Sequence, residues 1–115
     1  MNINELHFTT GDITESVDPA LLDDFLQSLP SWRVSGVSIA TLVRDFKFRN
    51  FVDAMAFAED ICSLAEQYNH HPELKITYGN LQVSWWTHTA SGITTNDLFM
   101  AGQCDQAYAN ERDTS

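Results

Sequence analysis

Histidine is concentrated in one part of this 115-residue chain. His70 and His71 are adjacent and precede Pro72, and His88 follows a short way on, whereas His7 lies near the start and has no evident role. Imidazole titrates near neutral pH, so a group of histidines can donate and accept protons without a metal ion. The cluster therefore predicts acid–base chemistry at one place in the folded chain. The alternative is that the histidines are structural or merely exposed.

Zinc binding is a second way to use three histidines. Pro72 favours an extended backbone at His71, and neighbouring side chains of an extended chain point apart. His70 and His71 would then face different sides of one space rather than share one ion. Their spacing to His88 also matches no common zinc motif, so we expect no metal at this site.

Other residues with useful chemistry lie near the histidines in sequence. Glu66 falls four residues before His70, where a carboxylate can orient an imidazole or act as a base, and a solvated helix face is the alternative. Asp97 is predicted to start a helix and to contact the site only in a secondary way. Trp85 is predicted to lie in the core, whereas Trp86 is exposed or stacks on a flat ligand.

Apolar residues at spacings of three and four predict three helices, over residues 19–29, over residues 51–68, and from Thr94 or Thr95 onward. Asn50 can cap the second helix, and its predicted apolar side consists of Phe51, Met55, Ala58, Ile61, Cys62 and Ala65. Thr94 and Asp97 resemble a capping box with Asp in place of Glu.

Alternating apolar and polar residues predict four strands: a short one near Trp32, one over residues 40–48, and a hairpin whose two strands meet at a Gly79-Asn80 turn. The order α-β-β-α-β-β-α indicates an α+β fold. We expect two layers, with a four-stranded, largely antiparallel sheet and three helices packed on one face. The other face would be partly open, as a ligand floor or an oligomer interface. Strand alternation would place Trp86 and His88 over it, and the hairpin would bring His88 near the other two histidines.

Composition narrows the classes of function. The net charge is −10, from 16 acidic and 6 basic residues, which argues against nucleic acid and against an anionic membrane surface. No apolar run is long enough to cross a bilayer and no apolar signal segment is visible, so we expect a cytoplasmic protein. Cys62 and Cys104 are predicted to be reduced core thiols. The length fits a single domain over residues 1–115, with flexible ends at 1–16 and 110–115.

Glu66, His70-His71-Pro72, Tyr78, His88 and Asp97, in that order, resemble the signature of the pterin-4a-carbinolamine dehydratase family. The segments "FKFRNFVDAMAFAEDI", "LAEQYNHHP" and "TTNDLFMAG" follow the family's pattern as well, so the resemblance covers residues 21–104. The family's fold, a four-stranded antiparallel sheet with helices on one side, agrees with the predicted order of elements.

The resemblance implies a hydro-lyase. Family members dehydrate 4a-hydroxytetrahydropterins, such as 4a-hydroxytetrahydrobiopterin, to the quinonoid dihydropterin and water, without a metal or organic cofactor. In the family this reaction recycles the tetrahydrobiopterin that aromatic amino acid hydroxylases use. Members associate as dimers or tetramers, so a homodimer or homotetramer is expected here. The alternative is a dehydratase-like binding or assembly protein on the same fold, with little turnover.

By resemblance, His70, His71 and His88 form the catalytic set. His70 and His88 would act as acids on alternative faces of the ring, and His71 would bind the ring and serve as base together with Glu66. The substrate-binding residues implied are Asn69, His70, His71, Trp86, Thr87 and His88.

Three positions depart from the family's pattern. Leu74 stands where many members have Trp, Trp86 replaces a small residue of animal members, and Thr89 replaces an acidic residue often found after the third histidine. These changes affect the walls of the expected pocket and leave the three histidines in place.

Overall fold

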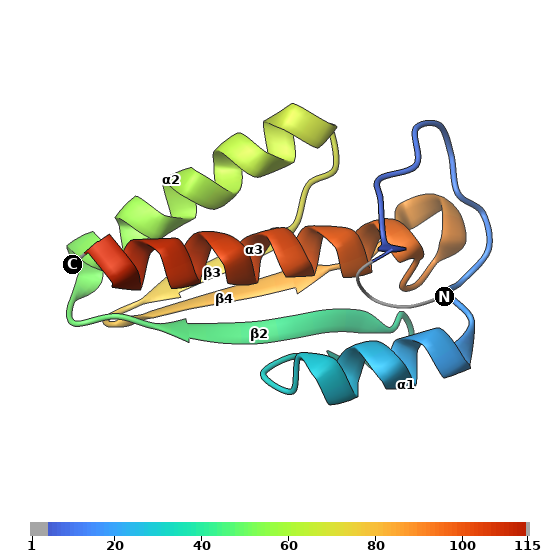
Figure 1. The fold of residues 1–115 in the computed structure, drawn as a ribbon, viewed down its shortest axis with the longest axis horizontal. Helices are drawn as coiled ribbons and strands as arrows, with labels where there is room; N and C mark the ends of the chain where they lie inside the picture. The colour runs from blue at the N-terminus through green and yellow to red at the C-terminus, as the bar shows by residue number, and fades with distance from the viewer. Residues whose placement is uncertain (1–4, 115) are drawn as a thin grey trace.

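The computed structural model describes residues 5–114, and Figure 1 shows the arrangement of its elements. The helices are α1 (Pro19–Ser28), α2 (Phe51–Tyr68), the short 3-10 helix η2 (His88–Ala90) and α3 (Thr95–Thr114). The strands are β1 (Arg33–Ser35), β2 (Thr41–Lys47), β3 (Glu73–Thr77) and β4 (Asn80–Trp85). Apart from η2, the order is α-β-β-α-β-β-α, as predicted.

The sheet has the strand order β1-β2-β4-β3, and every neighbouring pair is antiparallel. The central pair runs from Leu42 opposite Trp85 to Lys47 opposite Asn80, and it joins the two hairpins into one layer. Helix α2 contacts β3 and β4, and α3 contacts β2 and β4. Both helices cover the same side of the sheet (Figure 1), so the predicted two-layer α+β fold is confirmed.

Side-chain caps fix where the helices begin. Asp18 accepts a hydrogen bond from the backbone N–H of Ala20 (2.9 Å), and Asn50 accepts one from Asp53 (2.8 Å). These bonds satisfy backbone donors that the first turn of a helix leaves unpaired. The bounds of α2 are those expected from the sequence, and α1 ends one residue earlier than expected.

The core lies between the helices and one face of the sheet, and α1 contributes Phe25 to it. Its largest fully buried side chains are Trp85, Phe25, Phe46, Phe57, Leu42 and Ile61. Phe46 packs on Phe57, with ring centroids 5.0 Å apart, and edge-on against Trp32, at 6.0 Å. The prediction that Trp85 belongs to the core is confirmed.

A polar contact crosses this core. Arg44 on β2 meets Asp105 on α3 at 2.6 Å, and the indole N–H of Trp32 donates to the same carboxylate oxygen at 2.9 Å. Burial raises the pKa of Asp105, although the charge of Arg44 and both hydrogen bonds act against that rise. The group ties β2 and Trp32 to α3.

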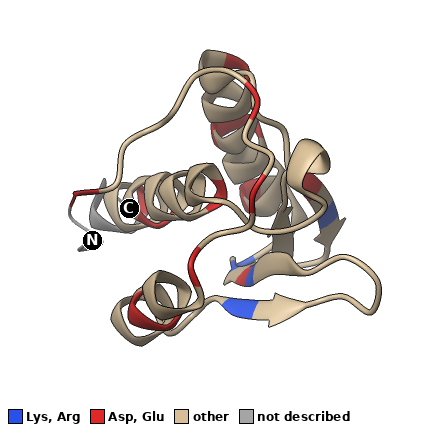
Figure 2. Cartoon of the chain, turned by 90° about the vertical axis from the view of Figure 1, so that its right-hand side faces the viewer, with Lys and Arg blue, Asp and Glu red and all other residues tan. Residues whose placement is uncertain are grey.

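Charge is distributed unevenly over the elements. Most acidic residues lie on the helices and connecting segments, with Asp45 on β2 and Glu73 on β3, whereas the basic residues in view lie on the strands (Figure 2). Arg33, Arg44, Lys47 and Lys75 belong to β1, β2 and β3. Among the residues that the structure describes, no helix is both long and apolar enough to span a bilayer.

Two details of the predicted turns and faces are wrong. The second hairpin turns at Tyr78-Gly79, one residue earlier than predicted, because Asn80 already pairs with Thr77. Gly79 has a φ of +71°, a conformation that glycine adopts readily. The side chain of Asn80 instead donates to Asp45 on β2, at 3.1 Å.

The buried side of α2 is rotated relative to the apolar side that was predicted from the sequence. The buried residues are Ala54, Phe57, Ala58, Ile61 and Ala65. Phe51 and Met55 are 46% and 41% exposed. Cys62 is also exposed, so only Cys104 is a core thiol, although both cysteines are free. The helix is apolar over a wide arc, and the sheet covers the part that carries Phe57.

Candidate active site

The end of α2 sets the directions of the first two histidines. Asn69 follows the helix in the left-handed conformation (φ 51°, ψ 45°), and its N–H and that of His70 both donate to the carbonyl oxygen of Ala65. This is a common way to end a helix, because it satisfies a carbonyl that the last turn leaves unpaired. The chain turns sharply after α2, so the side chains of His70 and His71 lie in different surroundings.

His70 points inward. Its Nε2 lies 2.6 Å from Oδ1 of Asp97, and its ring stacks on the Trp85 indole with centroids 5.5 Å apart and planes 12° from parallel. The His70 side chain is only 15% exposed, and Asp97 is fully buried. The stacking on Trp85 and the contact of Nε2 with Asp97 together fix the orientation of the His70 ring.

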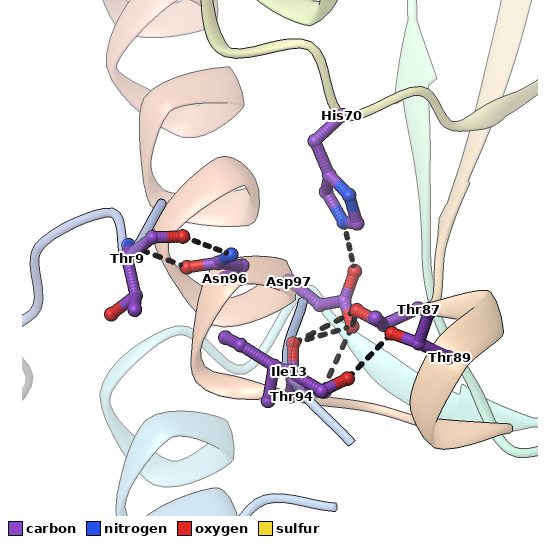
Figure 3. Close-up of polar contacts among 8 residues, drawn as sticks. All are labelled: Thr9, Ile13, His70, Thr87, Thr89, Thr94, Asn96 and Asp97. Atoms are coloured by element: carbon purple, nitrogen blue, oxygen red, sulfur yellow. Dashed lines mark hydrogen bonds and ion pairs between the residues drawn. The ribbon is translucent and has the colours of Figure 1, made fainter. Parts of the chain in front are cut away.

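Asp97 is itself held from several sides, as Figure 3 shows. Its second oxygen, Oδ2, accepts hydrogen bonds from the hydroxyl of Thr87 and from the backbone N–H of Thr94, each at 2.8 Å. The bond to Thr94 is one half of the predicted capping box at the start of α3. The expectation that Asp97 contacts the site only in a secondary way is wrong. The first turn of α3 faces the end of α2, and the carboxylate reaches His70 directly.

His71 points outward and pairs with the other carboxylate. Its Nε2 lies 2.5 Å from Oε2 of Glu66, and both side chains are largely exposed, at 54% and 71%. Glu66 thus contacts an imidazole, and that imidazole is His71 rather than the buried His70. The two adjacent histidines therefore have one carboxylate each, one buried and one in solvent.

His88 begins η2 instead of lying on a strand. Strand β4 ends at Trp85, and the backbone of Thr87 is bridged to Gly92, which closes a small loop around η2. The Trp86 indole packs edge-on against the His88 ring, with centroids 5.5 Å apart. Trp86 and His88 are therefore neighbours, as predicted. This loop brings them together, rather than the alternation of side chains along a strand.

The three histidines line one pocket of about 650 Å³. All six residues predicted to bind substrate belong to its wall: Asn69, His70, His71, Trp86, Thr87 and His88. Glu66 is not among the lining residues and reaches the pocket only through His71. The pocket lies beyond the end of β4, between the end of α2 and the start of α3, and no residue of the four strands lines it. The open face of the sheet is therefore not its floor.

One wall of the pocket was not predicted. Residues 8–13, which we call the N-terminal strap, contribute the lining residues Phe8, Thr10, Gly11, Asp12 and Ile13. The Phe8 ring packs against Tyr68 at 5.1 Å and lies 6.2 Å from the ring of His70. The only signal in the sequence is the pair of apolar residues, Phe8 and Ile13, in a polar stretch. The flexibility expected for residues 1–16 stays a prediction.

Metal binding has no obvious counterpart at this pocket. Within the described part of the chain, no three His, Cys, Asp or Glu side chains are grouped as a metal ion would require. Two carboxylates beside the pocket instead hold imidazole nitrogens, in the pairs His70–Asp97 and His71–Glu66. Such pairs fix the ring tautomer and prepare the other nitrogen to give or take a proton.

Two carboxylate-held histidines beside a pocket are an arrangement that can support proton transfer to a small molecule. The family model described as pterin 4 alpha carbinolamine dehydratase matches residues 15–107, which is most of the chain. The chain belongs to this family, and the resemblance found in the sequence is confirmed.

Similar proteins agree with this membership. A protein of Hahella chejuensis is 40% identical over 97 residues, 82% of this chain and 85% of that protein. One of Saccharophagus degradans is 40% identical over 84 residues, 72% of this chain and 74% of that protein. Both carry the name pterin-4-alpha-carbinolamine dehydratase as a provisional designation.

Solved structures share the fold. The crystal structure of a transcriptional coactivator/pterin dehydratase from Brucella melitensis superposes with a TM-score of 0.74 at 26% identity, over 82% of this chain and 99% of that one. A pterin dehydratase-like protein identified as a RuBisCO assembly factor in the alpha-carboxysome gives a TM-score of 0.57 at 20% identity, over 68% and 89% of the chains. The second likeness concerns the fold alone.

Proposed function

We propose that this chain is the hydro-lyase that its family implies, and that the pocket between α2 and α3 is its active site. The reaction removes water from a pterin 4a-carbinolamine. The C4a–O bond breaks, a ring N–H loses its proton, and the N–H electrons form the new C=N bond of the quinonoid dihydropterin. The departing hydroxyl takes one proton and the ring gives one up, so an acid and a base suffice.

The observation that carries this proposal is the contact between His70 and the buried Asp97. Oδ1 of Asp97 accepts the hydrogen bond, so Nε2 of His70 is the donor and Nδ1 is the nitrogen that exchanges a proton with substrate. His70 is thereby suited to protonate the departing hydroxyl.

The other two histidines complete the proposed set. His88 serves as the second acid, beside the Trp86 indole that supports one side of the pocket. His71 donates from Nε2 to Glu66, which leaves Nδ1 to accept the ring proton. Glu66 remains in contact with water, through which the proton can leave.

Three further expectations remain proposals. The substrate is of the 4a-hydroxytetrahydrobiopterin type, and the reaction takes part in tetrahydrobiopterin recycling in the cytoplasm. The chain forms a homodimer or homotetramer, which agrees with the exposed apolar side chains of Phe51, Val52 and Met55 on α2. Light scattering of wild type and Val52→Glu tests the last point, because a buried glutamate in a contact between copies would shift the mass towards the monomer.

The test of function is the dehydration of synthetic 4a-hydroxytetrahydropterin by purified protein, followed by absorbance. We expect acceleration over the spontaneous reaction that survives treatment with strong chelators. A folded protein that binds pterin but does not accelerate the reaction would instead favour the alternative, a binding or assembly protein on the same fold. Activity that disappears with the chelator and returns with a metal would contradict the mechanism.

A further inference from the structure

The N-terminal strap is the part of the pocket wall that precedes the residues matched by the family model. The family match begins at residue 15, whereas the strap comprises residues 8–13. The strap therefore lies outside the residues that the family model matches, and it lies beside the histidines.

Hydrogen bonds hold the strap at both ends. At Thr9, the backbone N–H donates to the side-chain oxygen of Asn96 and the carbonyl accepts from the Asn96 amide, each at 2.9 Å. At Ile13, the carbonyl accepts from the hydroxyl of Thr89 at 2.5 Å. Figure 3 shows both attachments close to Asp97. The three residues between them are therefore held at a fixed place on the pocket wall.

Thr89 connects this wall to the reaction centre. It is the residue that replaces the acidic group often found after the third histidine, and it directly follows His88. An acidic side chain here would have no proton to offer to the carbonyl of Ile13, whereas a hydroxyl does. The hydroxyl at residue 89, in place of an acidic group, therefore supplies one of the two attachments of the strap.

Within the attached segment, the backbone turns at Gly11 and then presents Asp12. Gly11 has a φ of +90°, a region that favours glycine. Asp12 lines the pocket and is exposed to solvent. Among the described residues that line the pocket, Asp12 is the only acidic one.

Most other polar side chains of the wall are already engaged. The Asn96 amide is paired with Thr9, the Thr87 hydroxyl with Asp97, and the Thr89 hydroxyl with Ile13. The three histidines are assigned to proton transfer. Asp12 is therefore the charged group left for recognition of the ligand.

A pterin ring presents a matching group at the end away from C4a. Its N3–H and its 2-amino group are adjacent donors that point the same way, and a carboxylate accepts two such bonds in parallel. We propose that Asp12 binds this 2-amino-4-oxo edge and thereby selects pterins and places C4a towards the histidines. The identity of the ligand rests on the proposed function, whereas the choice of Asp12 rests on the position of the strap in the pocket wall.

The test compares Asp12→Asn with Glu15→Gln. Both variants lose one negative charge from the same exposed segment, but Glu15 does not line the pocket. We expect Asp12→Asn to raise KM by about tenfold to a hundredfold with little change in kcat, as for the loss of a charge-assisted bidentate contact that is present in ground and transition states alike. Glu15→Gln should match wild type. Circular dichroism and thermal melts confirm that each variant is folded.

Direct binding separates this inference from the proposed function. Titration calorimetry uses a 7,8-dihydropterin and its 2,4-dioxo analogue, which lacks the 2-amino group. Wild type should prefer the 2-amino ring, and Asp12→Asn should lose that preference, whether or not the protein turns over carbinolamine. Equal preference in both proteins, or the same loss in Glu15→Gln, would overturn the role of Asp12 and leave the dehydratase proposal standing.

Discussion

The Asp97 carboxylate lies 2.6 Å from the Nε2 atom of His70 and has no exposure to solvent. A buried carboxylate in contact with an imidazole fixes both the orientation of the ring and the nitrogen that carries the proton. This contact joins two helices, since His70 follows α2 and Asp97 lies in the first turn of α3.

Replacement of Asp97 by Asn tests that contact. The amide keeps the shape of the side chain but removes its charge and can present a donor to Nε2. We therefore expect kcat for carbinolamine dehydration to fall by about tenfold to a hundredfold, as for other groups that orient a functional histidine. Binding of a dihydropterin, measured by calorimetry, should change little. A variant that retains full kcat would show that His70 does not depend on this partner.

Loss of the histidines should affect the chemical step directly. His70→Ala and His88→Ala are each expected to lower kcat by about a hundredfold to ten-thousandfold, the usual contribution of a positioned acid or base. His7→Ala is the matched control, because this exposed histidine does not line the pocket and should leave kcat unchanged. Full activity in the His70/His88 double variant would sink the proposed mechanism.

The strap should loosen when its attachment at residue 89 is removed. In Thr89→Val the side chain keeps its branched shape but can no longer donate to the Ile13 carbonyl. We expect hydrogen exchange of the backbone amides in the strap to accelerate several-fold, with exchange in α2 unchanged. Thr41→Val is a suitable control, because its hydroxyl donates to Ser35 within the first hairpin. Equal exchange rates in wild type and Thr89→Val would mean that this bond does not hold the strap.

Asp45 and Asp105 should make the free energy of unfolding depend on pH in opposite directions. Burial acts to raise the pKa of Asp45, but the hydrogen bonds from Asn80, Arg33 and Gln82 and the charge of Arg33 outweigh it and hold the pKa below its usual value. Its contribution to the free energy of unfolding is therefore present above about pH 4 and is lost as the pH falls through the lowered value.

The pKa of Asp105 is raised by burial, so its contribution is present at low pH and is lost as the pH rises through the raised value. Urea unfolding of wild type, Asp45→Asn and Asp105→Asn between pH 3 and 7 checks both signs. The advantage of wild type over Asp45→Asn should shrink towards acid pH, and its advantage over Asp105→Asn should shrink towards neutral pH. The same trend in both comparisons would contradict the assignment.

The two thiols should react very differently. Cys62 is exposed, whereas burial raises the pKa of the Cys104 thiol to about 12. Because the thiolate is the reactive form, a disulfide reagent at pH 8 should modify one thiol per folded chain rapidly. The second thiol should react only in denaturant. Cys62→Ser should abolish the fast reaction, and rapid modification of two thiols in the folded protein would contradict the packing around Cys104.

The parts of the fold that follow from local pattern were predictable. Helix α2 has apolar periodicity and an asparagine cap, and both of its bounds were predicted correctly. The choice of which apolar arc packs on the sheet was not predictable, since Phe51 and Phe57 are equally apolar. The turn at Tyr78-Gly79 was displaced by one residue for a similar reason, because Asn80 suits a turn but is drawn into β4 by its pairing with Thr77 and its bond to Asp45.

The candidate site was likewise predictable from the sequence only in part. The adjacent histidines and the nearby Glu66 are visible as a short motif, and the resemblance to a family added Asp97 to it. The direct contact of Asp97 with His70 depends on how two helix ends meet in space, which no local pattern encodes. The strap depends on bonds that span 76 and 87 residues, so its polar sequence looks like an unstructured end until Thr89 and Asn96 are placed beside it.

These long spans have a consequence for the order in which a newly made chain can become an enzyme. The strap is synthesised first, but Thr89 and Asn96 follow about 4 to 17 seconds later at ordinary rates of translation, as does Asp97, which orients His70. A nascent chain that ends before residue 89 carries both adjacent histidines and no closed pocket. Competence to bind pterin should therefore appear abruptly once the first turn of α3 has been made and can meet the strap and His70.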